Sequence, residues 1–210
     1  MNKRVKAVAV AAAIFAAASL AQSCSALNDM ASVLANLQRL KFKLAGVRDF
    51  RLLGIDLSGK TRLTDFGAGE ALLLVQSFRS RKLPVDFILD VVAVNPNDGT
   101  GGTRRTTSTL TGLECRLLID QKPTVTGNIE KPLEIPGTGQ ESLIPIRLSF
   151  DLLEFFGDQR YDDVLGLALA IGGRSRNPAR LALDAQPTVQ TPVGPITYPG
   201  RLTIVSTEFH

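Results

Sequence analysis

The clearest alternation of apolar and polar positions in the chain covers residues 85–98, with the sequence VDFILDVVAVNPND. Every second residue from Val85 to Ala93 is apolar, while the opposite face begins with two aspartates and ends with two valines. This pattern predicts a β-strand that is half exposed at its start and buried on both faces at its end. Pro96 removes a backbone donor, so the strand is expected to end in a turn at Asn95-Pro96-Asn97.

Similar two-residue periods, bounded by turn-forming residues, predict further strands along the chain. They lie at residues 41–44, 49–57, 112–120, 124–129, 133–136, 142–150, 179–185, 188–192 and 202–206. Gly46 breaks the first two apart or forms a bulge, and Pro145 restricts the 142–150 strand to an edge or to one-sided pairing. Short strands at regular spacing favour a mainly β fold, an antiparallel sandwich with a few short helices.

Apolar residues at three- and four-residue steps predict the helices. These cover residues 27–40, 64–78, 151–156 and 161–171. The last is apolar on all sides but too short to span a membrane, so we expect it over one end of the sheet. Asp65 is the expected N-cap of the second helix. Arg79, Arg81 and Lys82 follow that helix and suit its dipole, with a phosphate or headgroup site as the alternative.

Residues 1–23 have the pattern of an export signal, because Lys3, Arg4 and Lys6 precede an uncharged, Ala-rich core. Residues 20–25 (LAQSCS) resemble a bacterial lipobox, although Gln22 is bulkier than usual and the Leu lies one place early. Acylation of Cys24 would anchor the protein to a membrane. The alternative is ordinary cleavage after Ala21, which leaves Cys24 unmodified.

These features predict three parts: a signal peptide at 1–23, a lipidated Cys24 with a short amphipathic helix at 24–41, and a β-sandwich domain at 42–210. The mature protein is then an exported lipoprotein that faces the periplasm. Ser25 follows Cys24 where inner-membrane retention would favour Asp, so the outer membrane is the preferred location.

The formal net charge of +4 does not indicate a nucleic-acid partner. Three of the 24 Lys and Arg residues lie in the signal segment, which leaves 21 against 20 Asp and Glu. Trp is absent and aromatic residues make up 6% of the chain, so there is little material for a base-stacking surface.

The residues that usually carry catalysis are scarce. The single His is His210, so no Ser-His-Asp set can form inside the fold. The sequence contains no Cys-x-x-Cys, His-x-x-x-His or Gly-x-Ser-x-Gly, and the Gly-rich 99–109 loop lacks the phosphate-loop pattern. Cys115 shares a strand face with Leu113 and Leu117, which predicts a buried, unpaired thiol. No catalytic residue, metal ligand or cofactor is therefore expected.

Three segments together resemble the LEA type 2 family, the LEA14-like proteins with a WHy (water stress and hypersensitive response) domain. They are VDFILDVVAVNPND, GLECRLLIDQKPTVTGN and LEIPGTGQESLIPIRLSFDLL, within residues 85–155 or about a third of the chain. Asn95, Pro96 and Asn97 match the family tripeptide, and Gly127 and Ile135-Pro136 match later landmarks. The 99–109 loop is an addition to the family pattern.

The resemblance implies a fibronectin-III/immunoglobulin-like sandwich without enzymatic activity or cofactor, and an association with desiccation and stress tolerance. We expect a binding or structural role in the cell envelope, with an unidentified envelope protein as one class of partner. The alternative is a carrier of a lipid or another apolar ligand. A carrier would need a cavity between the inward faces of the 85–95 and 143–150 strands.

Overall fold

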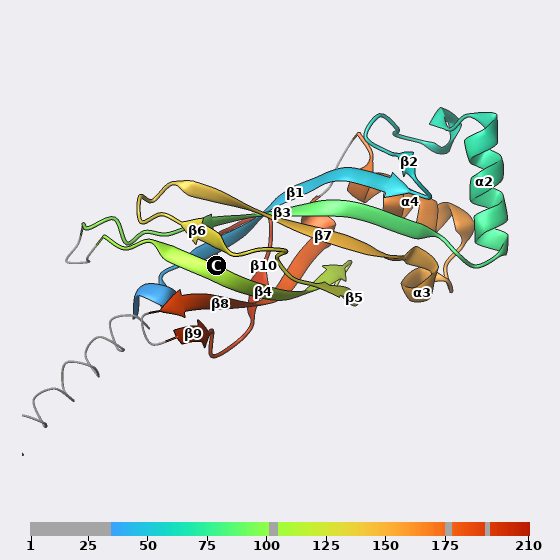
Figure 1. The fold of residues 1–210 in the computed structure, drawn as a ribbon. Helices are drawn as coiled ribbons and strands as arrows, with labels where there is room; N and C mark the ends of the chain where they lie inside the picture. Colours follow the sequence, from blue (N-terminus) through green and yellow to red (C-terminus); the bar gives the residue numbers. More distant parts are fainter. Residues whose placement is uncertain (1–34, 101–104, 175–177, 192–193) are drawn as a thin grey trace, which may run out of the picture. The chain divides into compact units, whose positions relative to one another are not determined.

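The computed structural model describes residues 35–100, 105–174, 178–191 and 194–210. The chain divides into two compact units, residues 1–39 and 40–210. In the first, residues 35–38 are helical, while the expected signal peptide, Cys24 and most of the expected 27–40 helix lie outside the described residues. The second unit is an antiparallel β-sandwich with a few short helices (Figure 1).

The first sheet has the strand order β2-β1-β3-β7. Its strands are β1 (Lys41–Leu52), β2 (Ile55–Asp56), β3 (Pro84–Val94) and β7 (Glu141–Asp151). β3 pairs antiparallel with β1 on one side and with β7 on the other, which makes it the central strand. β7 is the last strand in this order and therefore an edge strand, as expected from Pro145 in the 142–150 strand.

The second sheet has the order β10-β8-β4-β5, with β6 paired to β4 and β9 paired to β8. Its strands are β4 (Ser108–Ile119), β5 (Lys122–Gly127), β6 (Leu133–Ile135), β8 (Leu181–Thr191), β9 (Gly194–Thr197) and β10 (Leu202–Ile204). The two strand orders together are those of a fibronectin-III-like sandwich, so the predicted fold class is confirmed.

The core lies between the sheets, and β3 shows why. Its alternate side chains from Val85 to Ala93 are at most 2% exposed and face the second sheet. Val92 and Val94 on the opposite face are only half-buried, so the predicted burial on both faces at the end of this strand is wrong. The outer face of the first sheet borders solvent, because the sandwich has two layers.

β1 is one bulged strand rather than two. The register with β3 shifts between Leu44 and Gly46 and again between Arg48 and Arg51, so Gly46 marks a bulge as one of the two predicted alternatives. The predicted strand at 49–57 is interrupted by a tight turn at Leu53-Gly54, where both residues have positive φ and β2 folds back on β1.

β8 also differs from the prediction, because it continues through Pro187 instead of stopping near it. Tyr198 N donates to Pro187 O (2.9 Å), and the missing N–H of Pro187 points to the same side of the strand. On that side β10 pairs up to Ala185 and β9 pairs from Thr188 onward. Proline is tolerated at this position because it lies where one neighbouring strand replaces the other.

The helices α2 (Ala68–Arg79), α3 (Leu152–Phe156) and α4 (Tyr161–Gly172) gather at one end of the sandwich (Figure 1). α4 contacts β1 and has Val164 and Ala168 fully buried, which confirms the expected helix over the end of the sheet. Asp65 is not the N-cap of α2, which is Gly67. It belongs to the short 3-10 helix η1 (Leu63–Asp65), separated from α2 by the extended residue Phe66.

Both sides of the sandwich are closed by contacts between the sheets. On one side β5 approaches β7. On the other, the chain after β10 joins the first sheet: Leu44 N donates to Val205 O (2.9 Å), and Phe42 and His210 exchange backbone hydrogen bonds of 2.7 and 2.9 Å. Among the described residues, no helix combines the length and apolar character needed to cross a membrane.

Candidate functional site

The Asn95-Pro96-Asn97 tripeptide forms a buried corner where β3 ends. Both Asn residues are 0% exposed. The Asn95 Nδ2 group donates to Thr106 O (2.8 Å), Ile135 O (3.0 Å) and Ser108 Oγ (3.3 Å). Because Ser108 begins β4 and Ile135 ends β6, this one side chain ties the end of the first sheet to the second sheet.

Asn97 completes the corner through local contacts. Its backbone N–H and its Nδ2 both donate to Asn95 Oδ1, at 3.1 and 2.9 Å. Its carbonyl oxygen accepts from Thr106 N (3.1 Å), and Gly139 N donates to Asn95 O (3.1 Å). The sequence predicted that Asn97 would hold a local turn, whereas the longer-range bonds belong to Asn95. Since neither side chain reaches solvent, the corner supports the fold and offers no contact surface.

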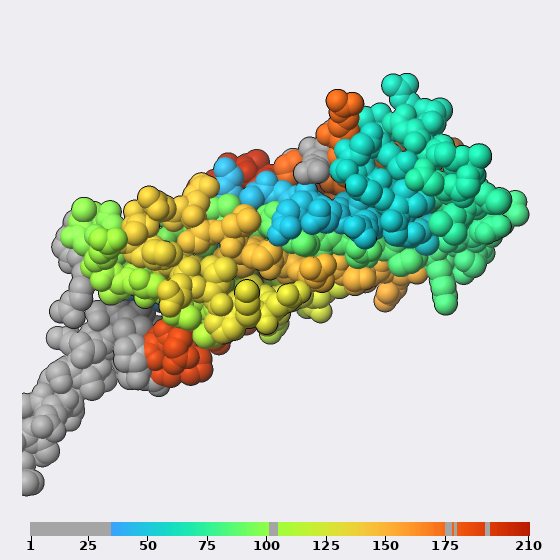
Figure 2. Space-filling model, turned by 45° about the horizontal axis from the view of Figure 1, so that its top comes forward, coloured from blue at the N-terminus to red at the C-terminus, as the bar shows by residue number. Residues whose placement is uncertain are grey.

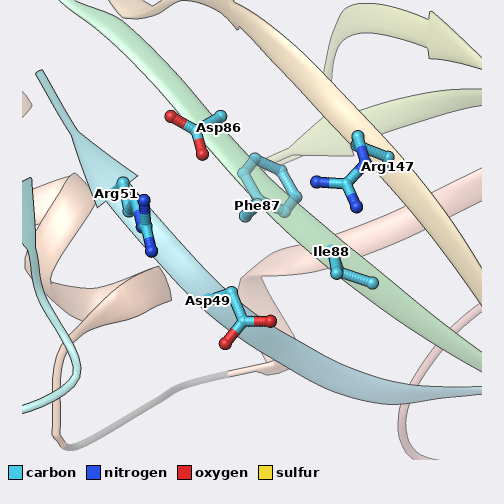
Figure 3. A pocket seen from close by; sticks show the side chains of 6 residues that line it. All are labelled: Asp49, Arg51, Asp86, Phe87, Ile88 and Arg147. Carbon is cyan, nitrogen blue, oxygen red and sulfur yellow. The ribbon is translucent and has the colours of Figure 1, made fainter. Parts of the chain in front are cut away.

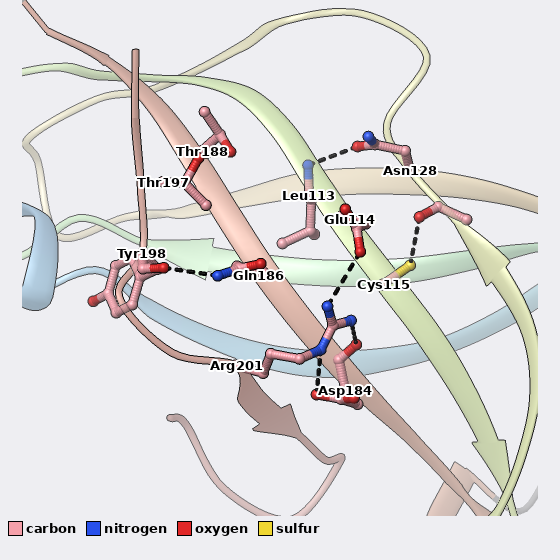
Figure 4. Close-up of polar contacts among 11 residues, drawn as sticks. Leu113, Glu114, Cys115, Asn128, Asp184, Gln186, Thr188, Thr197, Tyr198 and Arg201 are labelled. Carbon is pink, nitrogen blue, oxygen red and sulfur yellow. Dashed lines mark hydrogen bonds and ion pairs between the residues drawn. The ribbon is translucent and has the colours of Figure 1, made fainter.

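Gly127 allows the two sheets to meet along the β5–β7 side. A Cβ atom at this position would lie 2.5 Å from Leu148 Cδ2 and 3.4 Å from Ile146 Cγ2, so a larger residue would collide with β7. The carbonyl oxygen of Gly127 accepts a weak hydrogen bond from Cys115 Sγ (3.4 Å; Figure 4). Both residues therefore belong to the closure of the sandwich.

Cys115 is a free, buried thiol, as its sequence pattern predicted. Burial raises the pKa of this thiol to about 11, and the contact with Gly127 O only partly opposes the shift. At neutral pH the sulfur is protonated, and a thiol reacts as a nucleophile only through its thiolate form. Cys115 is thus a core side chain rather than a reactive one.

An ion-pair cluster lies on the outer face of the second sheet (Figure 4). Arg201 donates from Nε to Asp184 Oδ1 (2.8 Å), from Nη2 to Asp184 O (2.8 Å) and from Nη1 to Glu114 Oε1 (3.2 Å). The hydrogen bond to Asp184 raises the pKa of Arg201. The cluster joins the segment before β10 to β8 and β4, and all of its charges are paired, so it has the character of structural support.

A shallow hollow of about 200 Å³ opens on the outer face of the first sheet (Figure 3). It is lined by Asp49, Arg51, Asp86, Phe87, Ile88 and Arg147. β1, β3 and β7 place these residues side by side: Arg51 is the register partner of Asp86, and Ile88 is that of Arg147. Asp49 lies in the second bulge of β1 and has a φ of 54°. The bulge displaces Asp49 from the regular alternation of side chains along β1.

Two carboxylates and two guanidinium groups surround this hollow, together with the half-buried side chain of Ile88. Arg48 lies beside them and pairs with Asp49 (3.3 Å) and with Asp90 (2.9 Å). No lining residue is a Ser, Cys, His or Lys. Its interleaved charges fit a polar partner surface better than a small anionic or cationic ligand. The sequence showed Asp86 as a surface carboxylate but could not indicate which arginines lie beside it.

The faces that would line a carrier cavity are closely packed. The inward side chains of β3, together with Ile144, Ile146 and Leu148 of β7, are at most 2% exposed. Phe87 stacks on Phe50 with ring centroids 5.1 Å apart and meets Phe150 edge-on at 6.2 Å. Within the described ranges, no cluster of three or more His, Cys, Asp or Glu residues could hold a metal ion.

Comparison with known proteins assigns no family. No family model matches the chain, and no curated protein matches it. The resemblance to LEA type 2 proteins therefore stays a hypothesis that rests on the motifs within residues 85–155.

Proposed function

We propose that this protein is a non-enzymatic, lipid-anchored cell-envelope protein of the LEA type 2 class, with a binding or structural role under stress or desiccation. The observation that carries the proposal is the buried Asn95-Pro96-Asn97 corner. Both asparagines of the tripeptide that resembles the family signature are buried, and Asn95 joins the end of the first sheet to segments of the second. Its burial supports a family motif that specifies the sandwich rather than a reaction.

The chemistry of the described side chains also supports a role without catalysis. Cys115 is protonated and buried, and ion pairs on the outer sheet faces join Arg48 to Asp90 and Arg201 to Asp184. The surface that best suits contact with another molecule is the hollow between Arg51, Asp86 and Arg147. Its interleaved charges favour a polar surface of an envelope protein as the partner. The burial of the inward side chains of β3 and β7 gives less support to the alternative of an apolar-ligand carrier.

The anchor can be tested by substitution of each cysteine in turn. Cells that express wild type, Cys24→Ala or Cys115→Ala are labelled with palmitate and separated into membrane and soluble fractions. We expect wild type and Cys115→Ala to carry label and to stay with the membranes, and Cys24→Ala to lose both properties. A Cys24→Ala protein that labels and fractionates like wild type contradicts the lipid anchor.

The stress role needs a separate test in the cell. A strain that lacks the protein is complemented with wild type, with Cys24→Ala, or with Arg51→Glu/Arg147→Glu, and survival after drying is counted. We expect wild type to restore survival and the other two to restore it only in part. Equal survival of the deletion strain and its parent would rule out the proposed stress role.

A further inference from the structure

Exposed apolar side chains concentrate on one helix. Of the six large apolar side chains that are exposed in the described part of the chain, four lie in α2 or in the 3-10 helix before it. They are Leu63 (41% exposed), Leu72 (59%), Leu73 (42%) and Val75 (38%). α2 stands at the end of the sandwich, and Figures 1 and 2 show its outer side open to solvent. An exposed apolar patch of this kind usually marks an interaction surface.

The orientation of α2 is set by its inner side. Leu74 is 1% exposed, and the Phe78 ring meets the Tyr161 ring of α4 edge-on with centroids 5.1 Å apart. At 100° per residue, Leu72 then points away from the sandwich, and Leu73 and Val75 lie on the two flanks of the helix beside it. The exposure is therefore a property of the packed helix and not of an undocked one.

Basic residues lie next to this apolar face. Arg79, Arg81 and Lys82 are all exposed at the C-terminal end of α2, and none of the ion pairs found among the described residues involves them. The Arg81 guanidinium donates from Nη2 to Gly157 O (3.2 Å), which leaves its positive charge without an acidic partner. Arg81 has a φ of 56°, and Lys82 N donates to Ser77 O (3.0 Å), which ends the helix in a tight turn. This turn keeps the three cations together at one end of the apolar face.

The acidic residues at the opposite end of α2 are already engaged. The Glu70 carboxylate accepts from Lys60 Nζ (2.8 Å) and from Gly67 N (2.8 Å), and these bonds hold its pKa below the usual range. Asp65 accepts from Thr61 N (2.7 Å) and Arg62 N (3.0 Å), with the same effect on its pKa. α2 thus presents exposed apolar side chains next to a group of cations at its C-terminal end that form no ion pair among the described residues.

We propose that α2 docks on the surface of an anionic lipid bilayer. Leu72, Leu73 and Val75 would enter the boundary between headgroups and acyl chains, and the adjacent cations would contact lipid phosphates. A bilayer suits this surface because it accepts a convex helix without a preformed groove, and because it offers negative charge directly beside an apolar layer. The docking does not depend on acylation of Cys24. Where both occur, α2 adds a second membrane contact to the anchor.

The chain contains no Trp, so one substitution provides a probe of this contact. The full-length protein with Leu72→Trp is reconstituted into phosphatidylethanolamine/phosphatidylglycerol vesicles, with or without brominated acyl chains. The matched control is Leu143→Trp, because Leu143 is 51% exposed on β7, away from α2. Unfolding midpoints close to wild type verify that both variants fold.

We expect the fluorescence of the Leu72→Trp probe to shift to shorter wavelength and to be quenched by brominated lipid, and that of the control to do neither. Neutral phosphatidylcholine vesicles should reduce the quenching. Each change among Arg79→Gln, Arg81→Gln and Lys82→Gln should weaken docking about fivefold at low salt.

Two results would overturn the proposal. In one, the two Trp probes respond alike to brominated lipid. In the other, the Leu72→Trp probe shifts without quenching, which means that a protein or a second copy of the chain covers α2. The palmitate experiment on Cys24 separates this outcome from a failure of the lipid anchor, because the Trp probe reports only on α2.

Discussion

At the scale of single residues, Asn95 shows how a buried amide can join distant segments. Its amide has two donor hydrogens and two acceptor positions, and these are used by groups from three segments: the start of β4, the end of β6 and the neighbouring Asn97. A buried polar side chain contributes to stability only if its hydrogen-bond partners are all present. A buried donor or acceptor without a partner destabilises the fold by its full free energy of desolvation.

The two asparagines should therefore differ in their effect on stability. Asn95→Ala removes the donor to the carbonyls of Thr106 and Ile135, and we expect it to lower the free energy of unfolding by about 2–4 kcal/mol. Asn97→Ala removes one local donor and should lower it by about 1 kcal/mol. Urea unfolding of both variants measures the difference. An Asn97→Ala variant that loses more than Asn95→Ala would mean that the corner depends on Asn97 instead.

Cys115 gives a prediction about reactivity. Because the thiol is 0% exposed and its pKa is raised to about 11, it should react with a maleimide far more slowly in the native protein than in urea at pH 7.5. The reaction is followed by mass spectrometry on the Cys24→Ala variant, so that one thiol is counted. Equal rates in the native and unfolded states would show that the β5–β7 side opens readily.

The same thiol predicts a pH dependence of stability. In the unfolded chain a thiol titrates near pH 8.5, so the unfolded state loses its proton first as the pH rises. The contribution of Cys115 is complete below about pH 8.5 and is lost as the pH approaches the folded value of about 11. The loss amounts to at most about 3 kcal/mol. Urea unfolding of wild type and Cys115→Ala from pH 7 to 10.5 should give converging curves, and parallel curves would contradict the assignment.

At the scale of elements, α4 contains a matched pair of glycines. A Cβ atom at Gly172 would lie 2.2–2.5 Å from atoms of the buried Phe50 side chain, whereas one at Gly166 would meet nothing within 4 Å. The first glycine permits the end of α4 to pack on β1. The second lies in the exposed face of the helix and has no such role.

The pair should respond to alanine in opposite directions. Gly172→Ala forces Phe50 or the helix to move, and we expect a loss of about 1–3 kcal/mol in the free energy of unfolding. Gly166→Ala should increase it by up to about 1 kcal/mol, because alanine favours a helix over glycine. Thermal and urea unfolding of both variants test this. A neutral Gly172→Ala would mean that α4 can shift away from β1 without penalty.

α2 is the element whose role was least visible in the sequence. Its run of Leu72, Leu73, Leu74 and Val75 extends around more of the helix than one packed face can bury, so part of the run has to be exposed. The cations after the helix were interpreted as suiting its dipole, with a headgroup site as the alternative. The exposure of the adjacent apolar residues favours that alternative.

At the scale of the whole molecule, the sandwich is closed where Gly127 of β5 meets Leu148 of β7. Gly127→Ala places a methyl group 2.5 Å from Leu148 Cδ2, and we expect it to lower the free energy of unfolding by about 1–3 kcal/mol. Leu148→Ala removes the colliding atom. It should therefore lower the free energy of unfolding less in the Gly127→Ala background than in wild type. Gly200→Ala is the control, since nothing lies within 4 Å of its Cβ position. Additive losses in the double variant would mean that the sheets do not meet through this contact.

Several features depend on local geometry and could be predicted from the amino-acid sequence. The alternation from Val85 to Ala93 specified a strand and its buried face, Asn95-Pro96-Asn97 specified the turn, and Pro145 specified an edge. These predictions hold because a two-residue period and a missing N–H act within a few residues, whatever the rest of the chain does.

Other features depend on residues far apart in the chain and become visible only in the folded protein. Asn95 finds an acceptor 40 residues away, Arg51 and Arg147 meet around one hollow, and Pro187 is tolerated because β9 replaces β10 beside it. The outward face of α2 belongs to the same group, since Leu74 and Phe78 select which side of the helix is covered. Such contacts are set by strand register and helix packing. Many residues determine these together, and each contributes only a small part of the stabilising free energy.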